Sequence, residues 1–244
     1  MVLVKRKCPP ERRKAVIAVR ATASSPTLSV GATPPQHFSI RISLRIAQTT
    51  RPGEAITIAT TGTVFEGCAT ARGSDPLAQR RGSLVATAAP TADAGSQQPR
   101  AINLGGLIVR KARAAEMPDQ DLKEKPGTRL LTIPAEGSVE VAHDLPVDRI
   151  FLHERKLREE DVVGEEWRFR FHDGWVGTTW WCWGDLEGEG EGGLREKRLS
   201  CWHEGMALWG HAKPDVGDGW VLGLDPAELV FEVEEEGSEF RFVE

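Results

Sequence analysis

The stretch Phe38-Ser39-Ile40-Arg41-Ile42-Ser43-Leu44-Arg45-Ile46 decides the fold class of this chain. Its apolar side chains alternate with serine and arginine at a period of two, which in a β-strand places all of them on one face. The stretch therefore predicts a strand with one face turned to a core. A turn at 51–54 follows, and the Ile- and Thr-rich segment 55–61 then predicts a second strand that folds back.

Short apolar or alternating segments recur through the rest of the chain, separated by turn residues. We expect further strands at 102–110, 129–133, 138–143, 166–171, 175–183, 198–203, 220–222, 228–233 and 239–243. Helix signals are few, and the one at Asp225-Pro226 leaves room for a single turn. Short strands with turns at this spacing are typical of an all-β antiparallel sandwich.

Charge is distributed unevenly along the chain. Residues 1–100 carry fourteen Lys and Arg against five Asp and Glu, whereas residues 101–244 carry seventeen against thirty-one. The basic segment 1–36 is interpreted as a disordered tail, because like charges and few apolar groups cannot offset the entropy of ordering. A mitochondrial presequence and a nuclear-localisation or nucleic-acid arm are the alternative interpretations of this segment.

The domain organisation follows from where the periodic signal is lost and regained. Residues 67–100 show no hydrophobic periodicity and are rich in Ala, Ser, Thr and Gly, which predicts a long mobile loop inserted in the domain. The sequence thus predicts a disordered tail at 1–36 and one sandwich domain at 37–244. No apolar run is long enough to span a membrane and no secretory signal is found, so a cytoplasmic location is expected, with a mitochondrial one as the alternative.

Several strand and turn motifs together resemble a known β domain. They are Pro52-Gly53-Glu54, Gly62-Thr63-Val64-Phe65-Glu66-Gly67, the segment from Ile133 to Leu145 and the segment from Gly164 to Phe169. This succession is similar to the immunoglobulin-like β region that accompanies fungal metalloendopeptidases of the deuterolysin type, and to uncharacterised fungal proteins with the same pattern. The resemblance covers about residues 38–172 and implies an immunoglobulin-like sandwich that acts as an accessory, binding or chaperone-like domain.

The zinc motif of those peptidases is not found in this chain. They hold zinc with two histidines four residues apart that flank a glutamate on a helix. The nearest arrangement here is His203-Glu204 with His211, whose histidines are eight residues apart. We therefore expect a chain that is not an enzyme, and we keep a metal-dependent hydrolase using His203, Glu204 and His211 as the alternative.

All eight tryptophans lie between residues 167 and 220. If 175–183 and 198–203 form a hairpin, Trp181 faces Trp202 across the strands and Cys182 faces Cys201. Cys182 and Cys201 are then a disulfide candidate in an oxidising compartment and buried thiols in a reducing one. The tryptophans either fill the core or present Trp181, Trp183 and Trp202 as an aromatic surface for a glycan or an apolar peptide.

The acidic segment 185–196 matches part of a calcium-loop pattern. Asp185, Glu187, Glu189 and Glu196 occupy loop positions 1, 3, 5 and 12, which carry oxygen ligands in such loops. Glutamate at positions 3 and 5, glycine at position 8 and the flanking strands depart from the pattern. The segment is interpreted first as a solvated hairpin loop and, as the alternative, as a calcium site.

These features favour a non-catalytic binding or protein-interaction module without a cofactor, its ligand a protein or a carbohydrate. Binding of nucleic acid by the folded part is disfavoured, because its acidic surface repels phosphate. A stabilising sandwich for a partner chain, with no ligand of its own, is the third interpretation.

Overall fold

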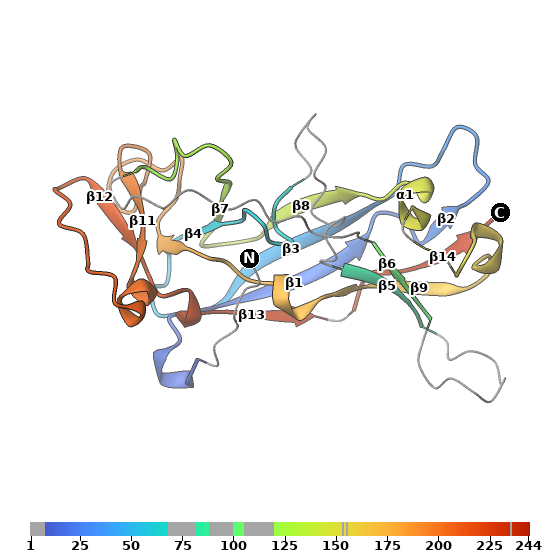
Figure 1. Ribbon diagram of the computed structural model, residues 1–244, viewed down its shortest axis with the longest axis horizontal. Coiled ribbons are helices and arrows are strands. Elements are labelled where there is room, and N and C mark those ends of the chain that lie inside the picture. Colours follow the sequence, from blue (N-terminus) through green and yellow to red (C-terminus); the bar gives the residue numbers. More distant parts are fainter. Residues whose placement is uncertain are drawn as a thin grey trace.

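The computed structural model describes residues 8–67, 82–87, 100–104, 120–152, 154, 156–234 and 236–244. Strands dominate this part of the chain, and Figure 1 shows them as several sheets packed on one another. The expected all-β, sandwich-like architecture is confirmed at this level. Among the described residues, no helix has the length and apolarity that crossing a membrane requires.

The first sheet contains the strand that the opening alternation predicts. Its strands, in spatial order, are β13 (Leu229–Glu234), β1 (Ala15–Ala23), β3 (Ser39–Thr49) and β8 (Val139–Asp144). β3 is antiparallel to both β1 and β8, whereas β1 and β13 run parallel. The alternation at 38–46 is therefore a strand of the sheet interior, paired on both sides.

Three further sheets complete the described fold. The second has the order β2 (Thr27–Ser29), β14 (Glu239–Val243), β9 (Glu166–Phe171), β5 (Gly82–Ala86) and β6 (Ala101–Asn103). The third has the order β10 (Trp181–Trp183), β4 (Ile56–Ala59) and β7 (Leu130–Ile133), and the fourth pairs β11 (Arg198–His203) with β12 (Trp220–Gly223). Two of these pairings, β14 with β2 and β11 with β12, are parallel, so the sheets are not purely antiparallel as expected.

Helical structure is short. In the residues that the structure describes it comprises α1 (Val147–Phe151) and the 3₁₀ turns η1 (Pro10–Arg12), η3 (Glu159–Asp161), η4 (Asp173–Trp175), η5 (Glu204–Trp209) and η6 (Pro226–Glu228). The helix signal at Asp225 is confirmed as the single turn η6, in which the Asp225 side chain accepts a hydrogen bond from the backbone N–H of Ala227 at 3.0 Å.

The main core lies where the first three sheets meet. Alternate residues of β1, β3 and β9 contribute its largest buried side chains, including Ile17, Ile42 and Trp167. A second, smaller cluster joins the third and fourth sheets, and its buried members are Ala59, Leu122, Trp180, Cys182, Leu194, Leu199 and Cys201. β10 contributes to both clusters, because Trp181 and Cys182 point to opposite faces.

The prediction of a disordered tail over 1–36 is wrong for residues 15–29. Residues 15–23 form β1 and lie between β3 and β13, and 27–29 form β2. Ile17 and Val19 are fully buried, with no exposed surface. The short run from Ala15 to Val19 is apolar enough to form a central strand, but the basic residues around it mask this run when composition is averaged. Residues 1–7 lie outside the described part.

The loop predicted at 67–100 also contains a strand. β5 is buried along its whole length between β9 and β6. Its first residue must be a glycine, because a Cβ atom on Gly82 would lie 2.3 Å from Cε2 of Phe169. The rest of the predicted insertion, at 68–81 and 88–99, lies outside the described residues.

The predicted hairpin of 175–183 with 198–203 is wrong. β10 pairs with β4, with Cys182 opposite Thr57, and β11 pairs in parallel with β12. The Trp-Cys and Cys-Trp sequences of the two segments therefore do not indicate a pairing register, because each segment pairs with another strand instead.

We expect Ile17→Ala to lower the free energy of unfolding by about 2–5 kcal/mol, because it opens a cavity in the main core. Arg20→Ala, on the exposed face of the same strand, is the matched control, with an expected change within about 0.5 kcal/mol. Urea denaturation of the full chain measures both values. Equal, small effects would support the disordered-tail interpretation over a central β1.

Candidate functional site

The three tryptophans of the predicted ligand surface do not form an exposed platform. Trp181 is fully buried and its Nε1–H donates to the backbone oxygen of Asp225 at 2.9 Å. Trp202 is 4% exposed, and its backbone oxygen lies 3.4 Å from Nε1 of Trp180. Trp183 is partly exposed, but the Arg51 guanidinium lies over its ring at 5.3 Å. The geometry favours the interpretation in which the tryptophans fill the core.

Cys182 and Cys201 lie in the second apolar cluster, and neither forms a disulfide. They reach this cluster from β10 and β11, which do not pair with each other. Burial raises the pKa of the Cys182 thiol well above its ordinary value, because the surrounding apolar side chains disfavour the thiolate. The environment of Cys182 is therefore that of a small buried apolar residue.

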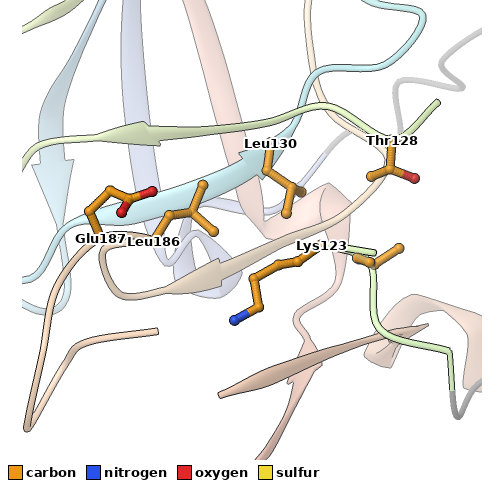
Figure 2. A pocket seen from close by; sticks show the side chains of 6 residues that line it. Lys123, Thr128, Leu130, Leu186 and Glu187 are labelled. Carbon is orange, nitrogen blue, oxygen red and sulfur yellow. The ribbon is translucent and has the colours of Figure 1, made fainter. Parts of the chain in front are cut away.

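The acidic loop that follows β10 already holds a cation from the protein. The Lys123 ammonium group donates to the backbone oxygens of Leu194 and Arg195 at 3.1 and 2.9 Å. Figure 2 shows Lys123 beside a small pocket, with Leu130, Leu186 and Glu187 on its other sides. The ammonium thus ties the segment around Lys123 to the end of the acidic loop.

The predicted calcium ligands are dispersed along the loop. Asp185 accepts from the backbone N–H of Glu187 at 3.1 Å, Glu189 pairs with Arg195 at 2.6 Å, and Glu196 is exposed. In the described part of the chain, no group of three or more His, Cys, Asp or Glu side chains is arranged to hold a metal ion.

The glycines of the acidic loop serve a tight turn. A Cβ atom on Gly193 would lie 2.3 Å from the backbone oxygen of Gly188. The two segments of the loop therefore approach too closely for any other residue type at this position. This packing requirement accounts for the glycine at loop position 9 without a metal ion.

The residues of the hydrolase alternative lie around η5. His203 ends β11, Glu204 begins η5 and ion-pairs with Lys14 at 3.3 Å, and His211 is exposed beyond the end of η5. The Glu204 carboxylate is thus directed to the segment before β1. The described structure brings no metal-binding cluster together from these three residues.

A charge cluster joins the segment before β1 to η6, and sequence reasoning missed it. Glu228 is 8% exposed and its carboxylate lies 2.8 Å from Nζ of Lys14 and 3.1 Å from Nη2 of Arg12. Burial alone would raise the pKa of Glu228, but the hydrogen bonds from Lys14 and Arg12 outweigh it and lower that pKa. Asp225 adds a second carboxylate 3.5 Å from Arg12. Two residues of the predicted basic tail are therefore fixed by buried acids.

A groove of about 470 Å³ runs between β7 and β8. Apolar side chains form part of its lining, and the charged Arg129, Glu140 and Asp144 line it as well. The lining residues are Thr60, Phe65, Gly67, Arg129, Leu130, Leu131, Glu140, Val141, Ala142 and Asp144. β7 and β8 follow each other in the chain, but each is the last strand of a different sheet (Figure 1).

The backbone of β8 presents free hydrogen-bonding groups to this groove. The N–H of Leu145 donates to the oxygen of Phe38, and the β3–β8 register continues without a bulge to Val139. Because antiparallel partners alternate between bonded and non-bonded pairs, Glu140, Ala142 and Asp144 turn their N–H and C=O groups away from β3. Within the described ranges, these groups have no backbone partner.

The facing rim, β7, has the same property. The N–H of Thr60 donates to the oxygen of Arg129, and the β4–β7 register continues from there. By the same alternation, Leu130 and Thr132 turn their backbone groups away from β4. The groove therefore lies between two strand edges, each with outward-facing hydrogen-bonding groups, and its floor includes the fully packed side chain of Phe65.

The sequence predicts the strands at 129–133 and 138–143, but not that both become sheet edges around a groove. Pairing partners far along the chain decide which strand is an edge. The signal within β8 is the pair of acidic residues Glu140 and Asp144, which lie on either side of Ala142 on the exposed face.

We expect Trp181→Ala to lower the free energy of unfolding by about 3–5 kcal/mol, because the indole is fully buried and hydrogen-bonded. Trp183→Ala, at the partly exposed neighbour, is expected to cost less. Chemical denaturation monitored by far-UV circular dichroism compares the two variants. A Trp181→Ala variant as stable as the parent chain would contradict the structural role.

We expect Glu228→Gln to destabilise the protein by roughly 1–3 kcal/mol at pH 7, because the charge-assisted hydrogen bonds with Lys14 and Arg12 are lost. The pKa of Glu228 is lowered in the native state, so its contribution is present above the unfolded pKa of about 4.3 and disappears as the pH falls further. The stability difference between parent and variant should therefore narrow in acid. Urea denaturation at pH 7, 5 and 3 measures it.

The control is Glu232→Gln on the neighbouring strand β13, an exposed carboxylate of the same charge. The free energy of unfolding of this variant is expected to equal that of the parent chain at each pH. A difference between parent and Glu228→Gln that stays constant down to pH 3 would contradict the role of the ion pairs.

No known protein family, curated protein or solved structure matches this chain in the comparisons. The resemblance to the immunoglobulin-like region of deuterolysin-type peptidases stays a prediction. The functional interpretation therefore depends on the geometry of the chain itself, in which the β7–β8 groove is the candidate site.

Proposed function

We propose that this chain is a non-catalytic protein-interaction module that binds an extended polypeptide segment in the β7–β8 groove. The observation that supports the proposal most is the open edge of β8 beside an apolar floor. Glu140, Ala142 and Asp144 offer backbone donors and acceptors, and the partly exposed Leu130 and Leu131 offer apolar contact. An extended polypeptide satisfies both kinds of group at once, because it carries donors, acceptors and alternating side chains.

A glycan ligand is less well supported. Stacking on sugar rings needs exposed aromatic faces, and Trp181 and Trp202 are buried while Trp183 is covered by Arg51. The groove offers leucine and valine rather than exposed aromatic rings along its rims. The accessory, immunoglobulin-like role that the sequence resemblance implies is part of the same proposal and is compatible with a sandwich-like fold that binds through a strand edge.

The experiment uses the ¹⁵N-labelled full chain and three capped octapeptides in which valine alternates with lysine, serine or glutamate. We expect at least one peptide to shift the backbone amide signals of Glu140 to Asp144 and Arg129 to Leu131, because the peptide enters the groove between them. A β-glucan hexasaccharide serves as the glycan probe. The same octapeptides methylated at every backbone amide are the control, because they keep no N–H with which to pair with a strand edge.

If no alternating peptide shifts these signals at millimolar concentration, the proposed function is wrong. If the hexasaccharide binds and the peptides do not, the glycan interpretation replaces it.

A further inference from the structure

We infer that the occupant of the groove joins the first sheet as a strand beside β8, and that it carries basic side chains at alternate positions. This inference rests on the proposed function and deepens it, because it specifies the binding mode and the chemistry of the partner. It starts from the three residues of β8 whose backbone groups point outward, Glu140, Ala142 and Asp144.

The same three residues set the side-chain pattern of the partner strand. In a β-strand the side chains of Glu140, Ala142 and Asp144 lie on one face of the sheet, and all three are exposed. Partner residues directly opposite them lie about 4.5–5.5 Å away at Cβ on that face. Two carboxylates there favour lysine or arginine, because opposite charges stabilise and like charges destabilise such cross-strand pairs.

The other face of the partner strand meets the groove floor. Val141 points to this side and is 7% exposed, and the fully buried Phe65 and partly exposed Leu131 line the same groove. Partner residues between the basic ones therefore contact apolar groups and are expected to be Val, Ile or Leu. The groove thus fits a strand in which basic and β-branched or aliphatic residues alternate.

The charges on β8 also disfavour a second copy of this chain as the occupant. Antiparallel self-pairing of β8 centred on Ala142 would place Glu140 of each copy opposite Asp144 of the other. Each copy would then oppose like charges at both positions, which is a recognised way for an edge strand to avoid edge-to-edge association. A heterologous basic segment removes this repulsion.

The first test compares the three octapeptides on the parent chain and on the charge-reversed variant Glu140→Lys/Asp144→Lys. The parent is expected to bind the lysine peptide at least about tenfold more tightly than the glutamate peptide, with the serine peptide between them. The variant is expected to reverse this order. An order that stays the same in the variant would overturn the basic-partner assignment while leaving groove binding intact.

The second test removes one outward-facing backbone donor. Ala142→Pro deletes the N–H that a partner strand would use, but no hydrogen bond to β3, and proline is tolerated on edge strands for this reason. Ala142→Val keeps the N–H and is the matched control. We expect the lysine peptide to bind Ala142→Pro about tenfold more weakly than Ala142→Val.

The third measurement needs no protein variant. In a strand beside β8, every second peptide amide faces β8, so methylation of one alternate set of amides should abolish binding while methylation of the other set leaves it. Equal tolerance of both methylated sets, with amide signals still shifted at the groove, would overturn strand addition but not groove binding.

Concentration-dependent shifts of the amide signals of Glu140 to Asp144 in the absence of peptide would indicate self-pairing and overturn the inference. Absence of binding by every peptide would overturn the proposed function itself.

Discussion

Burial of β1 between β3 and β13 is the constraint on which the rest of the structure depends. All residues from Ala15 to Val19 are buried, so both faces of this strand must be covered. The backbone of β1 is paired along one edge with β3, in an antiparallel register. Along the other edge it is paired with β13, in a parallel register, although β13 comes more than two hundred residues later in the chain. Segments near the two ends of the chain are therefore paired with each other in one sheet, and side chains of this sheet pack with those of the second and third sheets in the main core.

The charge cluster extends this central pairing by one step. The parallel register places Ala15 beside Leu229, so Lys14 and Glu228 are neighbours at the beginning of both strands. Their backbones are hydrogen-bonded, with the N–H of Lys14 donating to the oxygen of Glu228 at 3.0 Å, and their side chains form the ion pair described above. A parallel register has no hairpin to fix it. The ion pair between Lys14 and Glu228 can fix the register instead, because a shift of the two strands by one residue would leave the Glu228 carboxylate buried without its partners.

The sequence predicts a strand well where alternation of apolar and polar residues alone indicates it. It predicts structure poorly where pairing with a distant segment determines which strands are neighbours. The alternations at 38–46 and 166–171 are strands, because one buried face imposes a period of two regardless of the partner. β1 is missed, since a strand buried on both faces has no alternation and its basic neighbours dominate the composition. The hairpin of β10 with β11 is wrong for a related reason: similar residues at matching positions say nothing about which strand lies closer in space. The candidate site exists because β7 and β8 are the end strands of two different sheets, which depends on their distant partners. From the sequence, only the two strands and their two acidic residues could be predicted.

The uneven distribution of charge between the two halves of the chain reflects ion pairs that join them, not a disordered basic tail. Arg12, Lys14 and Arg45 of the basic half pair with acids of η6 and β13, and Arg45 reaches Glu234 at 2.8 Å. Attraction between the halves thus supports the same β1–β13 contact that burial requires, although exposed pairs such as Arg45 with Glu234 add little each.

At β8 the acids have no such partner in the sheet. Glu140 has no ion pair within the described residues, and Asp144 pairs with the exposed ring of His37 at 3.3 Å. In the described part of the chain, β8 is thus an end strand whose Glu140 carboxylate has no cationic partner. In the proposed binding mode, the charge that disfavours association of copies also favours a basic partner.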